Sequence, residues 1–209
     1  MQRANGSLKI SFSKNEISNL YYTTPLRAFS NDDGNNDIPA AVIVNTSGGL
    51  VSGDKHKINI NLKNNSKALI FSQSAEKIYK SVNNIEANIN NEIKVGDNSW
   101  LEWLPQETIL FEDSKLNRNL KIYLSKNSES LVGEIVVLGR LAKGEFTNNI
   151  FLKDSISIYK NSKIQWLDIV LFDDELKKAK KSITRLGGAN CFFTIVFSSE
   201  NVEKYEQII

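Results

Sequence analysis

Residues 45–62 read NTSGGLVSGDKHKININL, and this stretch gives the first indication of the fold. Its second half alternates apolar and polar side chains, with Ile58, Ile60 and Leu62 in the apolar positions. This period of two is typical of a β-strand with one buried face. Its first half holds three glycines, a composition typical of a turn between strands. The stretch therefore predicts a tight turn that leads into a half-buried strand.

The same turn comes within one residue of a phosphate-binding loop. Gly48 and Gly53 have the spacing of the G-x-x-x-x-G motif, but Asp54 stands where that motif requires a lysine. A carboxylate repels phosphate oxygens, and a strand pattern follows in place of the helix whose N-terminus would face the anion. The pattern argues against a nucleotide site. It leaves two interpretations: a plain glycine-rich turn, or a site that needs a carboxylate.

Most of the chain repeats this pattern of short strands. Alternating apolar residues recur at 120–124 and 164–170, and turns rich in Asn, Gly and Ser are expected at 63–67, 95–99 and 159–163. Strands spaced this closely favour a mainly β fold of stacked, largely antiparallel sheets over β-α-β units. No repeat in the sequence is regular enough to indicate a solenoid.

About two short helices are expected beside the sheets. Residues 130–142 place apolar side chains close to helical spacing, although their Val and Ile content suits a buried strand equally well. Residues 173–182 begin with acids and end with lysines, which complements the helix dipole. Because the chain has 209 residues and no long low-complexity linker, we expect residues 1–209 to form a single domain.

The composition excludes several classes of function. The 26 Lys and Arg nearly balance the 24 Asp and Glu, so the charge gives no reason to expect nucleic acid or an anionic membrane as a partner. The single cysteine, Cys191, rules out an internal disulfide framework, and the single histidine, His56, rules out a His-rich metal cage within one chain. Metal binding would depend on carboxylates, backbone carbonyls or a second protein. No signal peptide or membrane-spanning run is visible, and we expect a cytoplasmic protein.

Three further segments each have an ordinary structural explanation. Residues 73–81 (QSAEKIYKS) suit a strand end with a solvated face, and residues 101–111 (LEWLPQETILF) suit core packing beside a proline. Residues 138–145 (LGRLAKGE) contain Arg140 and Glu145, which suit an ion pair across a turn. Taken singly, none of these segments indicates a function.

Taken together and in order, the segments resemble the urease accessory protein D family (UreD, called UreH in some bacteria). Residues 25–29 (PLRAF), 48–54 (GGLVSGD) and the three segments above match the family's blocks at compatible spacing. The matching motif positions are Gly48, Gly49, Gly53, Lys77, Tyr79, Trp103, Pro105, Gln106, Gly139, Arg140 and Gly144. Lys80 replaces the arginine that is usual in the family. Residues 1–209 thus resemble a single UreD-like domain that lacks the C-terminal segment usual in the family.

The resemblance implies a scaffold and not an enzyme. Members of the family bind apo-urease, the accessory protein UreF and the GTPase UreG, and they help nickel to reach the urease active site through internal water-filled passages. The resemblance therefore implies no tightly bound cofactor, nickel in transit, and GTP that is bound by the partner GTPase and not by this chain. The fold that it implies is a stack of β-sheets with two helices.

Four acidic residues are the candidates for a transient nickel path. Asp54 of the Gly-Asp signature is the first candidate, followed by Glu134, Glu145 and Asp168. Scattered carboxylates would hold a metal weakly and let it leave, whereas a closed Cys/His cage would trap it. The alternative interpretation is a β-rich carbohydrate-active enzyme or sugar-binding domain in which paired carboxylates act as acid and base.

Overall fold

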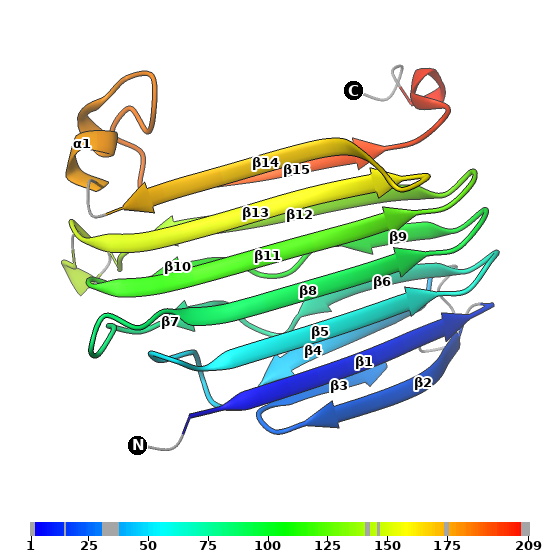
Figure 1. The fold of residues 1–209 in the computed structure, drawn as a ribbon, viewed down its shortest axis with the longest axis horizontal. Coiled ribbons are helices and arrows are strands. Elements are labelled where there is room, and N and C mark those ends of the chain that lie inside the picture. The colour runs from blue at the N-terminus through cyan, green and yellow to red at the C-terminus, as the bar shows by residue number, and fades with distance from the viewer. Residues whose placement is uncertain are drawn as a thin grey trace.

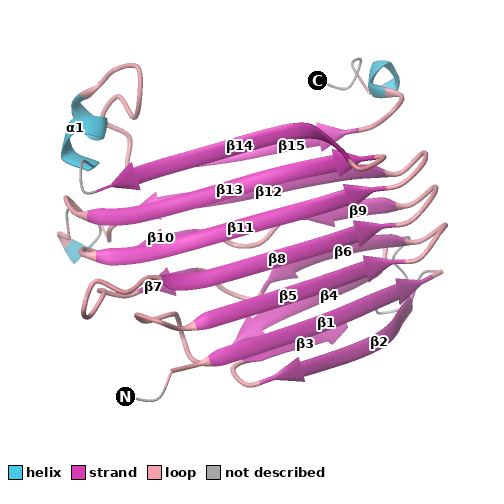
Figure 2. Cartoon of the chain, viewed as in Figure 1, coloured by secondary structure: helices cyan, strands magenta, loops and turns pink. Residues whose placement is uncertain are grey.

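Two β-sheets lie face to face in the computed structural model, which describes residues 3–14, 16–30, 38–140, 143–145, 147–173 and 176–205 (Figure 1). Sheet A has, in spatial order, β14 (Lys163–Asp173), β13 (Ile150–Lys160), β11 (Ser114–Leu124), β8 (Ala87–Val95), β5 (Lys55–Leu62), β1 (Asn5–Ser13) and β2 (Glu16–Thr23). Sheet B has β3 (Leu26–Ser30), β4 (Ala40–Asn45), β6 (Lys67–Ser72), β9 (Trp100–Trp103), β12 (Glu129–Leu138), β10 (Thr108–Leu110) and β7 (Glu76–Ile78), with β15 (Cys191–Ser198) paired to β12. The predicted mainly β stack is confirmed (Figure 2).

The direction of the strands differs from the prediction of largely antiparallel sheets, which is wrong. Only β1–β2, β3–β4, β13–β14 and β12–β15 pair antiparallel among the described strands; the central pairings of both sheets are parallel. The physical reason is that consecutive strands from β4 to β6, and again from β8 to β9 and from β11 to β13, change sheet at each turn. Each sheet therefore receives its strands in one direction, as in a solenoid. The repeat lies in the backbone path and not in the sequence.

One of the two predicted helices is a strand. Residues 130–138 belong to β12, whose side chains alternate between buried and exposed and which is paired on both edges, to β15 and to β9 and β10. Residues 141 and 142 of that predicted helix lie outside the described residues. The other prediction is confirmed by α1 (Leu176–Lys181), and a 3₁₀ turn, η2 (Val202–Lys204), follows β15. The described helices are too short and too polar to cross a membrane.

The core between the sheets consists of two apolar clusters. The larger cluster takes in the carboxyl-terminal halves of β8, β11 and β13, with Ile93, Leu120 and Ile156 as examples. The smaller cluster takes in the amino-terminal halves of the same strands, with Ile89, Leu116 and Leu152 as examples. Because these strands are parallel, the boundary between the clusters runs across them as one band: it lies at the same level in β11 and β13 and two residues further along in β8.

Candidate functional site

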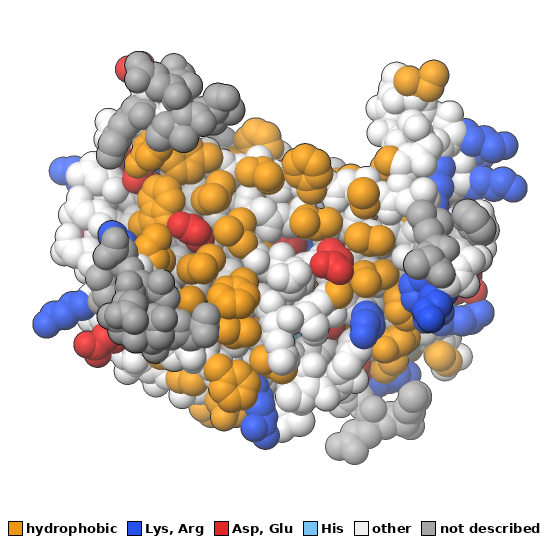
Figure 3. Space-filling model, turned by 180° about the vertical axis from the view of Figure 1, so that it is seen from behind, with side chains coloured by type: hydrophobic (Ala, Val, Ile, Leu, Met, Phe, Trp, Pro, Cys, Tyr) orange, Lys and Arg blue, Asp and Glu red, His pale blue; other side chains and the backbone are white. Residues whose placement is uncertain are grey.

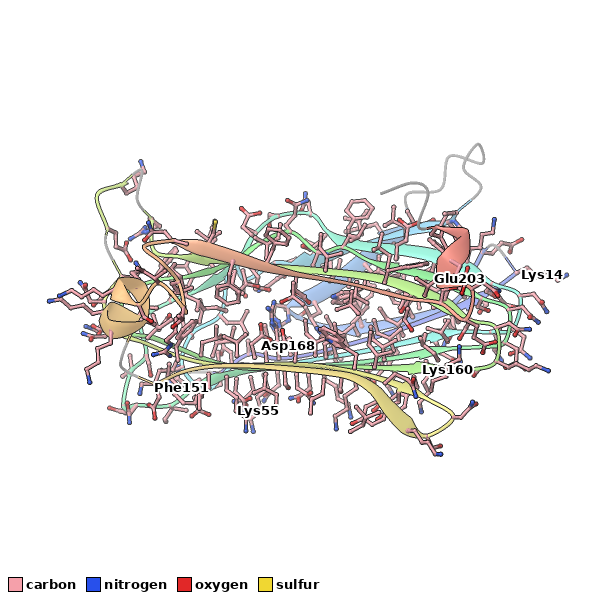
Figure 4. The ribbon with its side chains drawn as sticks, turned by 90° about the horizontal axis from the view of Figure 1, so that it is seen from above. Lys14, Lys55, Phe151, Lys160, Asp168 and Glu203 are labelled. Carbon is pink, nitrogen blue, oxygen red and sulfur yellow. The ribbon has the colours of Figure 1, made fainter. Side chains whose placement is uncertain are left out.

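A row of polar side chains marks the boundary between the two apolar clusters. β8, β11, β12 and β13 each place one polar residue there at an inward position, and β5 places one near its amino-terminal end. We call this set the polar seam: His56, Asn91, Arg118, Glu134 and Asp154. Each of the five is 6% exposed or less. Figure 4 shows the layer of side chains between the two sheets in which they lie.

The register of sheet A brings the seam residues of β5, β11 and β13 to one level, whereas Asn91 lies two residues further along β8. Ile89 of β8 pairs with His56 of β5 on one side and with Arg118 of β11 on the other. Arg118 in turn pairs with Asp154 of β13. Parallel strands lie about 4.8 Å apart, so residues paired in this way have neighbouring side chains on the inner face.

Arg118 joins the two sheets at the centre of the seam. Its Nε and Nη2 donate to the two carboxylate oxygens of Asp154 at 2.9 and 2.6 Å, within sheet A. Its Nη1 donates to Glu134 Oε2 at 2.6 Å and to Thr108 Oγ1 at 2.9 Å, both in sheet B. Trp103 Nε1 donates to the other oxygen of Glu134 at 2.8 Å. Every carboxylate oxygen of the cluster therefore has a donor, as a buried charge requires.

The charges of this cluster depend on one another. Burial alone would lower the pKa of Arg118, but the charges of Glu134 and Asp154 outweigh burial and raise it. Burial raises the pKa of Glu134, and the attraction of Arg118 opposes that rise. The guanidinium is thus what favours the ionised form of the Glu134 carboxyl. With both carboxylates ionised, the cluster carries one negative charge.

A cavity of about 100 Å³ leads from the seam to the surface of sheet B. Its deep end is lined by His56, Asn91, Arg118, Glu134 and Trp103. Its outer end, which we call the mouth, opens where the connections β6–β7 and β9–β10 interrupt the sheet. The mouth is lined by Asn45, Gly48, Gly49, Ser72, Ser74, Ala75, Glu76, Lys77, Pro105 and Gln106. The volume has room for several water molecules.

Three of the predicted motif segments converge at the mouth. The Gly48–Gly49 turn runs beside the strand that carries Lys77: Leu50 N donates to Lys77 O at 2.7 Å, and Tyr79 Oη donates to Gly48 O at 3.2 Å. Gly48 has φ +75° and Gly49 has φ +145°. A Cβ on Gly49 would lie 2.5 Å from Lys77 O, so only glycine lets the two segments approach this closely.

Asp54 lies beside the seam but not in the lining of the cavity. Its Oδ1 accepts a hydrogen bond from Ala4 N and its Oδ2 accepts one from Val51 N, both at 2.9 Å. The side chain is 4% exposed. In this position the carboxylate holds the glycine-rich turn against the start of β1. The structure thus gives Asp54 a local structural role, and its contact with nickel stays a prediction.

Glu145 lies in a separate turn with Arg140, and the predicted ion pair is present. Arg140 Nε donates to Glu145 Oε2 at 2.6 Å, and Glu112 N donates to Glu145 Oε1 at 3.0 Å. The backbone donor Glu112 lowers the pKa of Glu145, and Arg140 adds to this. Gly139 and Gly144, both with positive φ, shape the turn. None of these residues lines the cavity.

Asp168 lies on the inner face of β14, at the edge of the stack where β14 and β15 overlie one another (Figures 1 and 4). Its Oδ2 accepts a hydrogen bond from Thr194 Oγ1 of β15 at 3.3 Å, which links the two sheets. Of the four predicted acids, only Glu134 lines the cavity. Within the described part of the chain, no three His, Cys, Asp or Glu side chains come together in a group that could hold a metal.

Four residues of the site were not predicted from the sequence: Arg118, Asp154, Asn91 and Glu76. The first three carry a signal that was available: each is a polar residue at an inward position of a strand whose other inward residues are mostly apolar. His56 occupies the same kind of inward position in β5. Considered by itself, a single histidine in a strand is usually a surface residue or one with its hydrogen bonds satisfied. Burial lowers the pKa of His56 to about 4, against the opposing charge of Asp54, so the imidazole is neutral at pH 7.

Glu76 is a half-buried carboxyl at the mouth. Asn45 Nδ2 donates to its two oxygens at 2.9 and 3.2 Å. Burial raises the pKa of Glu76 to about 7, although the Asn45 hydrogen bond acts in the opposite direction. The mouth of the cavity therefore carries a carboxyl that changes charge near neutral pH.

This raised pKa makes the stability of the protein depend on pH. The pKa of Glu76 is about 7 in the folded state, against an ordinary value of 4.5. Below pH 4.5 the carboxyl is protonated in both the folded and the unfolded state and does not change the free energy of unfolding. Between pH 4.5 and 7 the unfolded state loses the proton more readily, so the free energy of unfolding falls as the pH rises. We expect Glu76→Gln to be more stable than the wild type at pH 8 by about 2 kcal/mol, and equally stable near pH 4.5. Urea unfolding at the two pH values measures this. Glu16→Gln, at an exposed position in β2, is the control and should show no such pH-dependent difference.

Comparisons with known proteins assign the chain to one family. A family model described as UreD urease accessory protein matches residues 4–209. A urease accessory protein UreD from Magnetococcus marinus is 31% identical over 203 residues, which cover 95% of this chain and 70% of that protein. Proteins of the same name from Chelativorans sp. and Cereibacter sphaeroides are 35% and 34% identical over 164 and 166 residues, covering 78% and 79% of this chain. Those matches span 58% and 60% of the two relatives, so the chain accounts for less than two thirds of their length.

Proposed function

The chain belongs to the UreD family of urease accessory proteins, and on that premise we propose that it acts in urease maturation as a non-enzymatic scaffold. In this role it bridges apo-urease to UreF and the GTPase UreG in the cytoplasm, and nickel passes through its cavity toward the urease active site. It has no tightly bound cofactor; nickel is cargo, and GTP is bound by UreG.

The observation that carries the proposal is the position of the family motifs. Segments 48–54, 73–81 and 101–111 meet at the mouth of one cavity, and the deep end of that cavity is polar. A passing cation would meet the carboxyl of Glu76 at the mouth and the carboxylate of Glu134 at the deep end. Oxygen ligands of this kind bind nickel weakly enough to release it.

Asp54, Glu145 and Asp168 complete the proposed set of nickel contacts, each in a different way. Asp54 lies beside the seam, with both carboxylate oxygens bonded to backbone amides. Glu145 and Asp168 lie outside the cavity lining, in a surface turn and at the edge of the stack. They would contact nickel before or after its passage through the cavity.

An exposed apolar face supports the scaffold role. Ile135 of β12 pairs with Phe193 of β15, and Ile195 lies two residues further along β15; these side chains are 44%, 69% and 63% exposed. Figure 3 shows hydrophobic side chains gathered over this side of the molecule. Exposed apolar patches of this kind mark protein interaction sites.

The carbohydrate-active alternative gains no such support. Two buried carboxylates, Glu134 and Asp154, are brought together in the structure, and both are bonded to Arg118. A catalytic acid and base need oxygens that are free to face a substrate across an open cleft. Here those oxygens are occupied by donors within the protein.

Closing the mouth tests the nickel route. Ser74 is exposed and lines the mouth, so Ser74→Trp should cover the opening without entering the core. We expect urease that matures with Ser74→Trp to hold at least about tenfold less nickel, because a bulky side chain there blocks access; nickel content is measured by elemental analysis of purified urease.

Gln73→Trp is the matched control, because Gln73 is the exposed neighbour of Ser74 and does not line the cavity. It should leave the nickel content unchanged, and both variants should copurify with UreF. Normal nickel content with Ser74→Trp, in a complex that still assembles, would contradict the route through this cavity.

A further inference from the structure

The deep end of the cavity holds two buried polar atoms without a partner. His56 Nε2 and Asn91 Oδ1 have no hydrogen-bond partner among the described residues, and both side chains line the cavity. The two residues are 2% and 5% exposed. An unpaired buried polar atom destabilises a folded protein. Two such atoms in the lining of one cavity therefore indicate that a ligand binds there.

The register places the two side chains close together on the same face of sheet A. His56 pairs with Ile89, and Asn91 follows Ile89 by two residues on β8. From the spacing of strands and the rise per residue, their Cα atoms lie about 8 Å apart. Both side chains point inward from adjacent strands, and a ligand between them can reach both.

The charged groups around the deep end of the cavity favour a cation over an anion as the ligand. Arg118 is the only Lys or Arg among the residues that line the deep end, and its guanidinium is already bonded to Glu134 and Asp154. Two carboxylates face this one guanidinium, so the seam favours an added positive charge. The two unpaired atoms, an imidazole nitrogen and an amide oxygen, are lone-pair donors that suit a metal ion.

We propose that His56 Nε2 and Asn91 Oδ1 hold a partly hydrated divalent transition-metal ion in the cavity, as a stopping point on the nickel route proposed above, on which this inference rests. Imidazole nitrogen suits Ni²⁺, and water fills the remaining coordination positions. Two protein ligands without a third His, Cys, Asp or Glu make a site that binds and releases. The sequence gives this chain a nitrogen ligand at a point where the predicted path had only carboxylates.

The single histidine of the chain makes the test specific. The 209-residue chain, with any affinity tag removed, is loaded with one equivalent of Ni²⁺ and studied by X-ray absorption spectroscopy. We expect imidazole scattering, which in this chain can arise only from His56, and we expect it to disappear in His56→Leu. Ni²⁺ affinity measured by calorimetry should fall about tenfold or more in His56→Leu, since even outer-shell partners of a metal contribute that much.

Variants at Asn91 separate binding from packing. Asn91→Asp should raise Ni²⁺ affinity, because it adds a charged oxygen ligand, and Asn91→Leu should lower it.

His56→Leu should also raise the melting temperature of the metal-free protein by about 2–4 °C, because it removes an unpaired buried atom. Ser130→Ala, at another buried and unpaired position that does not line the cavity, should leave Ni²⁺ binding unchanged.

The outcomes distinguish this site from the wider route. Absence of imidazole scattering, or equal Ni²⁺ affinity in the wild type and His56→Leu, overturns the site and shows that the cavity holds water only; the route stands if Ser74→Trp still lowers the nickel content of urease. If imidazole scattering is present but His56→Leu matures urease with normal nickel content, the site stands and the route through it fails.

Discussion

Arg118→Met is expected to lower the free energy of unfolding by about 3–5 kcal/mol. The guanidinium makes four hydrogen bonds, two to Asp154 and one each to Glu134 and Thr108, and all four residues are buried. Without it, two carboxyl groups remain inside the protein with no opposite charge. Both then have to take up a proton or bear the cost of an unpaired buried charge. Urea unfolding at pH 7 measures the loss.

Two further variants show whether the cost comes from the orphaned carboxyls. The triple variant Arg118→Met/Glu134→Gln/Asp154→Leu removes all three charges and keeps an oxygen for Trp103 Nε1, so we expect it to regain more than half of the lost stability. Arg140→Met is the matched surface control: its partner is also a glutamate, but the arginine side chain is 49% exposed, so its loss should cost less than about 1 kcal/mol. Equal losses for Arg118→Met and Arg140→Met would show that the seam has no special energetic role.

Gly49→Ala is expected to cost about 3 kcal/mol of stability and to damage the mouth of the cavity. The backbone at Gly49 has φ +145°, a conformation that L-residues rarely adopt. The added Cβ would also lie 2.5 Å from Lys77 O and 2.6 Å from the Tyr79 ring, so one of the two motif segments would have to move. The main obstacle is a backbone atom, which cannot rotate away as a side chain can. We therefore expect urease matured with this variant to hold less nickel than with the wild type.

Gly48→Ala separates the clash from the backbone strain. Gly48 has φ +75° and open space where a Cβ would be, so its substitution should cost only about 1 kcal/mol. Unfolding in urea compares the two variants, and elemental analysis of urease reads the effect on nickel. A Gly49→Ala variant as stable as Gly48→Ala would mean that the two segments are not held together as the structure shows.

The sequence predicted the strands better than their arrangement. Ile58, Ile60 and Leu62 alternate because one face of β5 is buried, and the structure confirms this strand and the mainly β stack. Alternation says which face of a strand is buried, but it is the same for parallel and antiparallel neighbours. The direction was missed because the turn after Leu62 leads into the opposite sheet and not back along the same one. Helical spacing at 130–142 misled for a related reason, since apolar residues four apart share one face in both a helix and a strand.

The sequence predicted residues in the outer part of the candidate site, but in its inner part only Glu134 and Trp103. The motif residues Gly48, Gly49 and Lys77 meet at the mouth, as a shared site requires. Arg118 and Asp154 belong to no quoted motif, and an isolated charged residue in a strand pattern is usually taken for an exposed one. Their pairing depends on β11 and β13 being parallel neighbours in one register, and no spacing within the sequence specifies that register.

The polar seam has a consequence for how the chain finds its fold. Parallel strands with a simple alternation of apolar and polar residues can slide past one another by two residues and still bury an apolar face. In this protein such a slip would carry Arg118 out of line with Asp154 and set its charge against an apolar neighbour, Leu152 or Ile156. The charged residues of the polar seam thus also make every misaligned pairing unfavourable, and they fix the register in which β11 and β13 pair.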